Sequence, residues 1–333
     1  MVRVAINGFG RIGRQVLQAG FKDKKIEWVA VNDLTDTKTL AHLFKYDSVY
    51  GVSPLKVKAT KEGIEIDGKR IKVFAEKDPE KLPWKELKVD IVVESTGFFR
   101  DREGAMKHIK AGAKKVLISA PAKDPDATLV MGVNEHKYNK KKDKIISKGS
   151  CTTTCVTPLI KVLHDAFKIK HAYMITGHAY TGSQRLVDAP HKDLREARAA
   201  AVSLIPAKTG AAKLAGKLIP SLDGKIDGVA WRVPVPCGSI VQVTAEVGKK
   251  VTVEQVNEVY KKAAKKLGVV MQYSKEPLVT HDIVKNEYSC IFDSLLTRVV
   301  DGNLVTVSGW YDNEWGYSFR LVDLAKYVAD NGL

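Results

Sequence analysis

Gly8, Gly10 and Gly13 form the pattern Gly-x-Gly-x-x-Gly between an apolar segment at 2–7 and a segment with helical apolar spacing at 11–21. This order constrains the fold more than any other feature of the chain, because strand, glycine-rich turn and helix are typical of the first unit of a dinucleotide-binding parallel sheet. The first glycine permits a tight turn, the second lets backbone N–H groups approach a pyrophosphate, and the third allows close helix–sheet packing. We therefore predict a cofactor-binding turn here.

Asp33 supports the same prediction. It lies twenty positions after Gly13, at the end of a second apolar segment at 26–31. A carboxylate at this point can accept hydrogen bonds from the adenosine ribose hydroxyls, and it repels a 2′-phosphate. NAD is therefore favoured as the cofactor, while use of NADP stays open because neighbouring residues can offset one carboxylate.

The pattern of elements changes near the middle of the 333-residue chain, a length that suggests two domains. Strand-like and helix-like segments alternate to about residue 150, which predicts an α/β doubly wound parallel sheet, or Rossmann domain, over 1–150. A helix at 151–167 is followed mainly by long strand-like segments and an amphipathic helix at 252–267. This order of elements predicts an α+β catalytic domain over 151–314 with a large, mostly antiparallel or mixed sheet. The stretch 179–207 is irregular apart from a helical pattern at 194–201.

Composition narrows the class of protein. The chain has 54 Lys and Arg against 38 Asp and Glu, a formal net charge of +16, with 44% hydrophobic residues and four cysteines. These values exclude a disordered chain and a disulfide scaffold, and no apolar stretch approaches the ~20 residues of a membrane helix. The first residues lack the order of a signal peptide, and so few cysteines suit a reducing compartment, so we expect a cytoplasmic protein without a membrane partner. The basic runs lack interleaved aromatic residues, which favours a solvated lysine-rich surface over a nucleic-acid site.

Cys151 is the strongest candidate for a nucleophile. It follows a glycine and Ser150 at the start of a predicted helix, where the helix dipole lowers the pKa of a thiol, and Ser150 and Thr152 could hold an anion at the same helix end. The alternative is a capped helix with a small buried cysteine. A zinc site is disfavoured because Cys237 and Cys290 are isolated, so no metal is expected.

A base is needed to activate the thiol, and His178 is the best candidate. It ends an apolar segment at 173–176 and begins the sequence His-Ala-Tyr-Thr-Gly. The other histidines, His108 among them, lie in contexts that are ordinary for structural residues or less distinctive.

Several motifs follow one another in a characteristic order. They are Asn-Gly-Phe-Gly-Arg-Ile-Gly (7–13), Ser-Cys-Thr-Thr-x-Cys (150–155), His-Ala-Tyr-Thr-Gly (178–182), Asp-Ala-Pro-His-Lys-Asp-Leu-Arg (188–195), Thr-Gly-Ala-Ala-Lys (209–213), Arg-Val-Pro-x-Pro (232–236) and Trp-Tyr-Asp-Asn-Glu-Trp-Gly-Tyr (310–317). Together they closely resemble the phosphorylating glyceraldehyde-3-phosphate dehydrogenases, over essentially residues 2–332.

The resemblance implies a homotetramer in which a C-terminal helix, within 315–333, joins the Rossmann domain. It also implies a reaction in which the Cys151 thiolate attacks the aldehyde of glyceraldehyde 3-phosphate and the adduct passes hydride to NAD. His178 would act as the base, and inorganic phosphate would then cleave the thioester to give 1,3-bisphosphoglycerate. The irregular stretch at 179–203 would correspond to a loop that packs on a neighbouring subunit.

Site residues follow from the resemblance position by position. Substrate-phosphate ligands would be Thr181 and Arg232, and the site of inorganic phosphate would be formed by Ser150, Thr152, Thr209 and Gly210. The implied cofactor contacts are Gly8, Gly10, Arg11, Ile12, Asp33, Lys77, Thr96, Gly97, Ser119, Asn313 and Tyr317.

Three positions depart from the family pattern. Thr154 replaces the usual Asn, Ser183 the usual Asp, and Glu196 the second Arg of Asp-Leu-Arg-Arg. The charge reversal at 196 predicts a shifted phosphate position or weaker phosphate affinity, with Arg195 or Arg198 as substitutes. Two alternatives remain at this stage, a paralogue acting on erythrose 4-phosphate and a nucleic-acid-binding side role of the basic surface.

Overall fold

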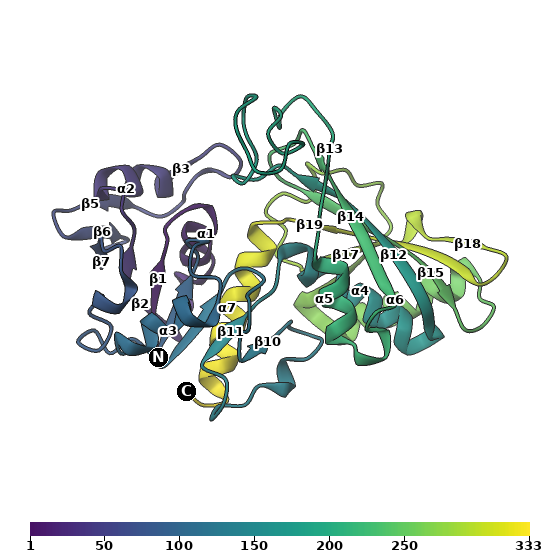
Figure 1. Cartoon of the computed structure of the whole chain (residues 1–333), viewed down its shortest axis with the longest axis horizontal. Coiled ribbons are helices and arrows are strands. Elements are labelled where there is room, and N and C mark those ends of the chain that lie inside the picture. Colours follow the sequence, from purple (N-terminus) through teal and green to yellow (C-terminus); the bar gives the residue numbers. More distant parts are fainter. The chain divides into compact units, whose positions relative to one another are not determined.

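The computed structural model describes residues 1–333, which divide into two compact units. One unit contains residues 1–150 and 318–333, and the other contains residues 151–317. Each unit is built on one large sheet (Figure 1). None of the helices is both long and apolar enough to cross a membrane.

A nine-stranded sheet organises the first unit, in the order β10-β11-β9-β8-β1-β2-β7-β6-β5. Neighbouring strands are parallel from β10 to β7, whereas β5, β6 and β7 pair antiparallel. The predicted doubly wound sheet is therefore confirmed. Its strands are β1 (Val2–Asn7), β2 (Ile26–Asn32), β5 (Val57–Ala59), β6 (Gly63–Ile66), β7 (Lys69–Phe74), β8 (Ile91–Glu94), β9 (Lys115–Ile118), β10 (Ala127–Thr128) and β11 (Ile145–Ser147), with a separate pair β3 (Tyr46–Asp47) and β4 (Gly51–Val52).

The helices of the first unit begin where the sequence supplies a cap. In α2 (Thr37–Lys45) the Asp36 side chain accepts a hydrogen bond from Thr39 N, and in α3 (Arg102–Lys110) Asp101 accepts one from Gly104 N. Such caps satisfy backbone donors that have no partner within the helix. By contrast, α1 (Arg11–Gly20) begins after Gly10 and has no side-chain cap.

The second unit contains an eight-stranded mixed sheet, which confirms the expected large sheet. Its order is β13-β14-β12-β15-β19-β17-β16, with β18 paired to β19. The β12/β14 and β16/β17 pairs are parallel and the others antiparallel. The strands are β12 (Ile169–Ala179), β13 (Ile205–Ala207), β14 (Ile226–Val233), β15 (Ser239–Val247), β16 (Met271–Ser274), β17 (Cys290–Asp293), β18 (Arg298–Val300) and β19 (Leu304–Tyr311).

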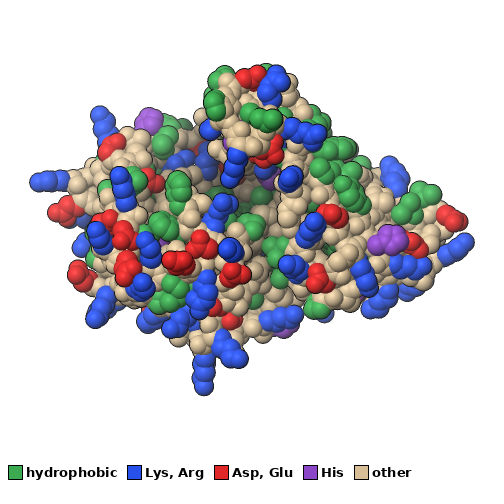
Figure 2. All heavy atoms as spheres, in the orientation of Figure 1, with side chains coloured by type: hydrophobic (Ala, Val, Ile, Leu, Met, Phe, Trp, Pro, Cys, Tyr) green, Lys and Arg blue, Asp and Glu red, His purple; other side chains and the backbone are tan.

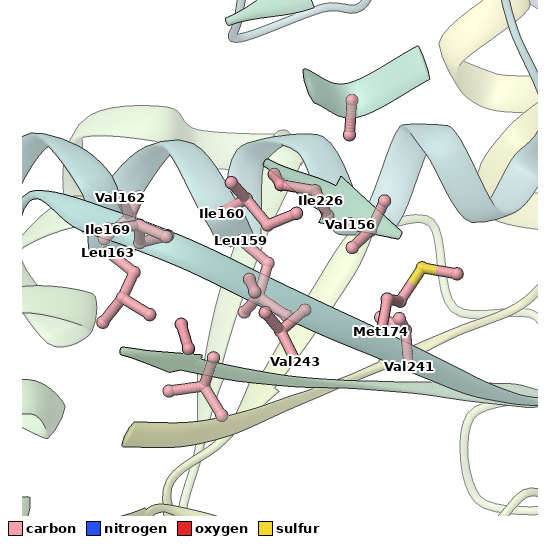
Figure 3. Packing of buried hydrophobic residues seen from close by; sticks show 14 of the residues in the cluster. Val156, Leu159, Ile160, Val162, Leu163, Ile169, Met174, Ile226, Val241 and Val243 are labelled. Carbon is pink, nitrogen blue, oxygen red and sulfur yellow. The ribbon is translucent and has the colours of Figure 1, made fainter. Parts of the chain in front are cut away.

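One buried helix, α4 (Cys151–Phe167), provides the core of this unit. Figure 3 shows its apolar side chains packed against those of β12 and β15, and the labelled residues are Val156, Leu159, Ile160, Val162, Leu163, Ile169, Met174, Ile226, Val241 and Val243. Because α4 is held along its length, its first residue, Cys151, has a defined position relative to the ends of the strands. The sheet is also covered by α5 (Ala211–Leu218) and α6 (Val253–Leu267).

The last helix, α7 (Trp315–Asp330), begins in the second unit, and its residues from Ser318 onward belong to the first. Lys326 Nζ lies 3.0 Å from Asp23 Oδ2, and Lys25 Nζ lies 2.8 Å from Asp330 Oδ2. These ion pairs connect the end of the chain to the loop before β2.

Several elements differ from the sequence-based expectations. The helical pattern at 194–201 forms turns and no regular helix. The strand expected at 173–176 is the eleven-residue β12, because sheet neighbours on both sides extend it beyond its apolar centre. Elements that the pattern did not indicate are the eight-residue α5 and the short strands β3, β4, β10, β11, β13, β16, β17 and β18. Elements this short contain too few turns or alternations to be recognised by periodicity.

Candidate active site

A cavity of about 570 Å³ opens at the carboxyl ends of β1, β2 and β8 in the first unit. Ligands of doubly wound sheets bind at this edge, where the strand order reverses. The cavity is lined by Asn7, Gly8, Gly10, Asn32, Asp33, Leu34, Glu76, Lys77, Ser95, Thr96, Phe98 and Phe99.

The glycine turn has the geometry that the sequence predicts. Gly8 has φ +91°, and a Cβ there would lie 2.6 Å from Thr96 N. A Cβ on Gly13 would lie 2.1 Å from the Gly8 carbonyl oxygen, so both positions require glycine. Since α1 has no side-chain cap, its N-terminus suits the binding of a pyrophosphate.

Asp33 is oriented at the rim of this cavity by two backbone donors. Its Oδ2 accepts a hydrogen bond from Phe9 N at 2.8 Å, and its Oδ1 accepts one from Thr35 N at 3.0 Å. Each carboxylate oxygen keeps a second lone pair for a ribose hydroxyl. The cradle of glycines and this acceptor therefore fit a dinucleotide.

The implied cofactor residues fall into three groups. Those that line the cavity are Gly8, Gly10, Asp33, Lys77 and Thr96. Four others belong to the first unit but do not line the cavity. Arg11 and Ile12 begin α1, and the Arg11 guanidinium lies 3.0 Å from Asp47 Oδ2. Gly97 and Ser119 follow β8 and β9. The remaining two, Asn313 and Tyr317, belong to the second unit.

In the second unit, Cys151 and His178 lie together. The Cys151 Sγ is 3.3 Å from His178 Nε2, because the first residue of α4 faces the end of β12. His178 Nδ1 lies 2.6 Å from the Ala179 carbonyl oxygen and 2.7 Å from Arg232 Nη1. In the tautomer that donates from Nδ1 to the carbonyl oxygen, Nε2 is the acceptor for the thiol proton. The predicted nucleophile and base are therefore within reach of each other.

The surroundings of Cys151 and His178 shift the pKa of each side chain in the direction that favours its neutral form. Burial raises the pKa of the Cys151 thiol, although the Arg232 charge and bonds at the helix start lower it. The sequence-based expectation of a lowered pKa at the helix N-terminus is therefore wrong in its net direction, since burial outweighs the helix end. Burial and the Arg232 charge lower the pKa of His178 to about 3. When the proton moves from Sγ to Nε2, the two charges form next to each other and stabilise each other.

Arg232 lies beside this pair because β12 and β14 are parallel with His178 opposite Arg232. Its Nη1 is 2.7 Å from His178 Nδ1 and donates to the Ala179 carbonyl oxygen at 3.4 Å. Its Nε is buried without a hydrogen-bond partner. A part-buried guanidinium with an unused, buried donor fits an anionic ligand such as phosphate.

The other implied phosphate ligands lie on separate elements of the same unit or at its boundary. Thr181 follows β12, and its hydroxyl is 3.0 Å from the Ser183 hydroxyl. Thr209 and Gly210 precede α5, where Ala211 N donates to Thr209 Oγ1. Ser150 precedes Cys151, and Thr152 is buried in the first turn of α4.

Tyr311, at the end of β19, is a site residue that sequence reasoning did not single out. Its hydroxyl lies 2.9 Å from Thr152 Oγ1 and 3.0 Å from Thr176 Oγ1, and its ring meets the His178 ring edge-on at 6.0 Å. Burial raises its pKa far above the ordinary value for tyrosine. Tyr311 therefore stays a neutral phenol that connects α4, β12 and β19. The motif at 310–317 contains this residue and was the available signal.

Asn313 has a defined amide orientation. Its Oδ1 accepts hydrogen bonds from Gly238 N and Ser239 Oγ, both at 3.1 Å, so its NH₂ group points the other way. Tyr317, in the first turn of α7, is buried, and burial raises its pKa.

Comparison with known proteins identifies the family of this chain. The model of the glyceraldehyde 3-phosphate dehydrogenase NAD binding domain matches residues 2–102, and the model of the C-terminal domain matches residues 150–313. The glyceraldehyde-3-phosphate dehydrogenase of Geobacillus stearothermophilus is 55% identical over 100% of this chain and 99% of that protein. Glyceraldehyde-3-phosphate dehydrogenase 2 of Streptomyces avermitilis is 54% identical over 99% of each chain, and glyceraldehyde-3-phosphate dehydrogenase 1 of Bacillus subtilis is 52% identical over 100% of this chain and 99% of that protein. The chain therefore belongs to the glyceraldehyde-3-phosphate dehydrogenase family.

Proposed function

We propose that this chain oxidises glyceraldehyde 3-phosphate with NAD and inorganic phosphate to 1,3-bisphosphoglycerate through a thioester on Cys151. Membership of the family makes the chain a glycolytic oxidoreductase with an NAD-binding domain. The observation that carries the residue-level proposal is the 3.3 Å contact between Cys151 Sγ and His178 Nε2 beside the unpartnered Nε of Arg232. This arrangement supports a site in which Cys151 is the nucleophile, His178 the base and Arg232 an anion ligand.

The steps follow from the positions of these side chains. Arg232 and Thr181 bind the substrate phosphate and orient the aldehyde toward Sγ. His178 Nε2 takes the thiol proton as Sγ attacks the aldehyde carbon, and passes it to the carbonyl oxygen, which becomes the hydroxyl of the adduct. The neutral Nε2 then takes this hydroxyl proton back when the adduct is oxidised. When bound, NAD supplies the hydride acceptor for this oxidation. Inorganic phosphate, held by Ser150, Thr152, Thr209 and Gly210, attacks the resulting thioester and releases Cys151.

The resemblance to the family assigns the following residues to NAD in this proposal. Gly8, Gly10 and Arg11 hold the pyrophosphate with the start of α1, and Asp33 holds the adenosine ribose. The Asn313 NH₂ group donates to the nicotinamide carboxamide, since its oxygen is already engaged by Gly238 and Ser239.

The assay that tests the function follows absorbance at 340 nm with glyceraldehyde 3-phosphate, comparing NAD with NADP, each with and without inorganic phosphate. We expect sustained reduction only when phosphate is present, and faster reduction of NAD than of NADP because of Asp33. A single burst that ignores phosphate would contradict the second half-reaction, and faster turnover of erythrose 4-phosphate would assign the chain to that substrate. Equal rates with both cofactors would overturn the role of Asp33.

Glu196 provides a test of the phosphate site. It is half-buried, and its backbone N–H donates to Asp193 Oδ1 within a loop where Arg198 already pairs with Asp188. Replacing Glu196 with Arg is expected to lower the KM for phosphate up to about fivefold, because an attractive charge replaces a repulsive one near a solvated anion. The measurement is the phosphate dependence of the rate at saturating NAD and aldehyde.

A matched control for this variant is Glu258→Arg on the exposed face of α6, which makes the same change in net charge. Its phosphate KM should equal that of the unmodified protein. An unchanged KM in Glu196→Arg, or equal decreases in both variants, would remove Glu196 from the phosphate site.

We also propose that the chain forms a homotetramer and acts in the cytoplasm. Exposed apolar side chains gather in and beside the irregular stretch 179–207, namely Leu186, Val187, Leu194, Val202 and Leu204. Such a group of exposed apolar residues favours contact with another subunit. None of the four cysteines forms a disulfide, which suits a reducing compartment. In Figure 2, lysine and arginine side chains are spread among acidic ones, which favours a solvated surface over a nucleic-acid site.

A further inference from the structure

The carboxylate of Glu94, at the end of β8, is buried and accepts four hydrogen bonds. Its Oε1 accepts from Thr96 N at 2.8 Å and from Thr96 Oγ1 at 2.5 Å. Its Oε2 accepts from Asn7 Nδ2 at 2.6 Å and from His108 Nε2 at 3.0 Å. Two of these partners, Asn7 and Thr96, line the cofactor cavity, whereas Glu94 itself does not.

His108 has a single tautomer in this arrangement. The indole Nε1–H of Trp84 donates to His108 Nδ1 at 3.0 Å, and an indole nitrogen can only donate. The proton of His108 is therefore on Nε2, which donates to Glu94. Both rings are fully buried, and they stack at 26° with their centroids 6.3 Å apart. Neither residue reaches solvent, and the further polar atom near His108 Nε2 is Asn7 Nδ2 at 3.4 Å, which is itself a donor.

The network continues along the floor of the cavity. Asn7 Oδ1 accepts a hydrogen bond from Asn32 Nδ2 at 2.7 Å. Asn32 in turn holds the backbone of Glu76, through its Nδ2 to the carbonyl oxygen at 2.9 Å and through its Oδ1 to the N–H at 2.8 Å. Glu94 therefore connects the ends of β8, β1 and β2 with the segment that follows β7.

We propose that Glu94 is a positioning residue for the dinucleotide, which holds Asn7 and the Thr96 turn in the places that the cofactor requires. This inference rests on the proposed function, since it concerns the same NAD cavity. A charged acceptor that binds four donors is a strong, geometrically specific support for a binding site. The cavity is thus formed before the cofactor arrives, which lowers the ordering cost of binding.

The chemistry of the four partners shows why glutamine cannot replace Glu94. An amide presents an NH₂ group where the carboxylate presented an oxygen, and every partner of that oxygen is a donor. The Thr96 backbone N–H can only donate a hydrogen bond. The Asn7 side-chain amide could present its oxygen only by rotating, and it would then lose its hydrogen bond with Asn32. His108 cannot offer a lone pair at Nε2 while Trp84 donates to Nδ1. Glu94→Gln therefore leaves buried donors facing each other.

The first experiment measures the Kd for NAD of the full-length protein and of Glu94→Gln by calorimetry. We expect the Kd to rise about 10- to 100-fold, the effect of disrupting buried hydrogen bonds to a charged group. The KM for NAD should rise in parallel, while kcat at saturating NAD and the KM for glyceraldehyde 3-phosphate stay the same. If Glu94 had only a structural role, Glu94→Gln would instead lower the melting temperature of the protein and the fraction of molecules whose Cys151 can be alkylated. The NAD Kd of the molecules that remain folded would then be unchanged.

The double variant Trp84→Phe/Glu94→Gln tests whether the Trp84 indole donor fixes the tautomer of His108. Phenylalanine removes the indole donor, so His108 can carry its proton on Nδ1 and accept at Nε2 from the amide of the introduced glutamine. The rescue is partial, because Asn7 Nδ2, the other partner of Glu94 Oε2, remains a donor. We expect the double variant to bind NAD several-fold more tightly than Glu94→Gln, although the loss of Trp84 volume by itself destabilises the core. Trp84→Phe alone should bind NAD like the unmodified protein. An additive or larger loss in the double variant would overturn the proposed network.

A conservative variant covers the case in which Glu94→Gln does not fold. Glu94→Asp keeps the charge but is one methylene shorter, so it cannot reach both Thr96 and His108. An NAD Kd equal to that of the unmodified protein in Glu94→Asp would overturn the proposal. If the unmodified protein itself fails to bind NAD, the proposed function is wrong; if it binds and the Glu94 variants bind equally well, only the positioning role is wrong.

Discussion

Replacing Cys151 with serine is expected to lower kcat for glyceraldehyde 3-phosphate oxidation by about 10⁴- to 10⁶-fold, the usual effect of losing a catalytic nucleophile. A serine hydroxyl is far less acidic than a thiol. The base that would have to deprotonate it is His178, whose pKa is lowered to about 3. Proton transfer from the serine hydroxyl to this imidazole is therefore much less favourable than transfer from the thiol. The measurement is the rate of phosphate-dependent NADH formation at 340 nm.

Two controls separate loss of chemistry from loss of structure. Cys151→Ser should retain the NAD affinity of the unmodified protein, because serine is close to cysteine in size and Cys151 is not among the residues proposed to hold NAD. Cys290→Ala changes a cysteine that is buried in the core of the same unit as Cys151 and should keep nearly full kcat. The expected loss leaves far less than about one per cent of the activity. Residual activity above about one per cent in Cys151→Ser would therefore mean that another group attacks the aldehyde.

Replacing His178 with asparagine is expected to lower kcat by about 10²- to 10⁴-fold, as for the loss of a general base. Burial raises the pKa of the Cys151 thiol, so without Nε2 at 3.3 Å its proton has no acceptor and the thiol stays neutral near pH 7. Asparagine is close to histidine in size, which limits the effect on packing next to Tyr311. Turnover and the rate of Cys151 alkylation by iodoacetamide are the two readouts.

The sign of the pH dependence follows from the same groups. In the unmodified protein, transfer of the proton to His178 lets the thiolate form below the thiol's own pKa. In His178→Asn the thiolate appears only as the pH rises through the raised pKa of Cys151. The ratio of alkylation rates, unmodified to variant, should therefore be largest near pH 6–7 and shrink as the pH rises. A ratio that does not depend on pH would contradict the role of His178 as the proton acceptor.

Predictions from the sequence agree best with the structure for features that depend on neighbouring residues. The Gly8 turn, Asp33 after β2 and Cys151 at the start of α4 are all visible in short stretches of sequence, because glycine content, apolar periodicity and strand ends are properties of neighbouring residues. The helical pattern at 194–201 was misleading for the same reason. Its periodicity is local, but its largest apolar side chain, Leu194, is 83% exposed in the folded chain, and the stretch forms turns instead.

His108 shows the opposite case. In the sequence it is one of eight histidines and stands in an ordinary helical context. In the structure it is fully buried between Trp84 and Glu94, residues 24 and 14 positions away, and it shares hydrogen bonds with both. No spacing rule connects these three residues, because the packing of α3 on the sheet brings them together.

The sequence by itself determined the two sheet-based domains, the dinucleotide turn and the candidates Cys151 and His178, since backbone preference and hydrophobic patterning act over a few residues. Only the tertiary structure decided which groups meet. The register that sets His178 opposite Arg232, 54 positions apart, depends on the pairing of β12 with β14. The raised pKa of the Cys151 thiol and the four donors around Glu94 depend on burial. Burial and register are properties of the folded chain as a whole, which is why short sequence patterns do not contain them.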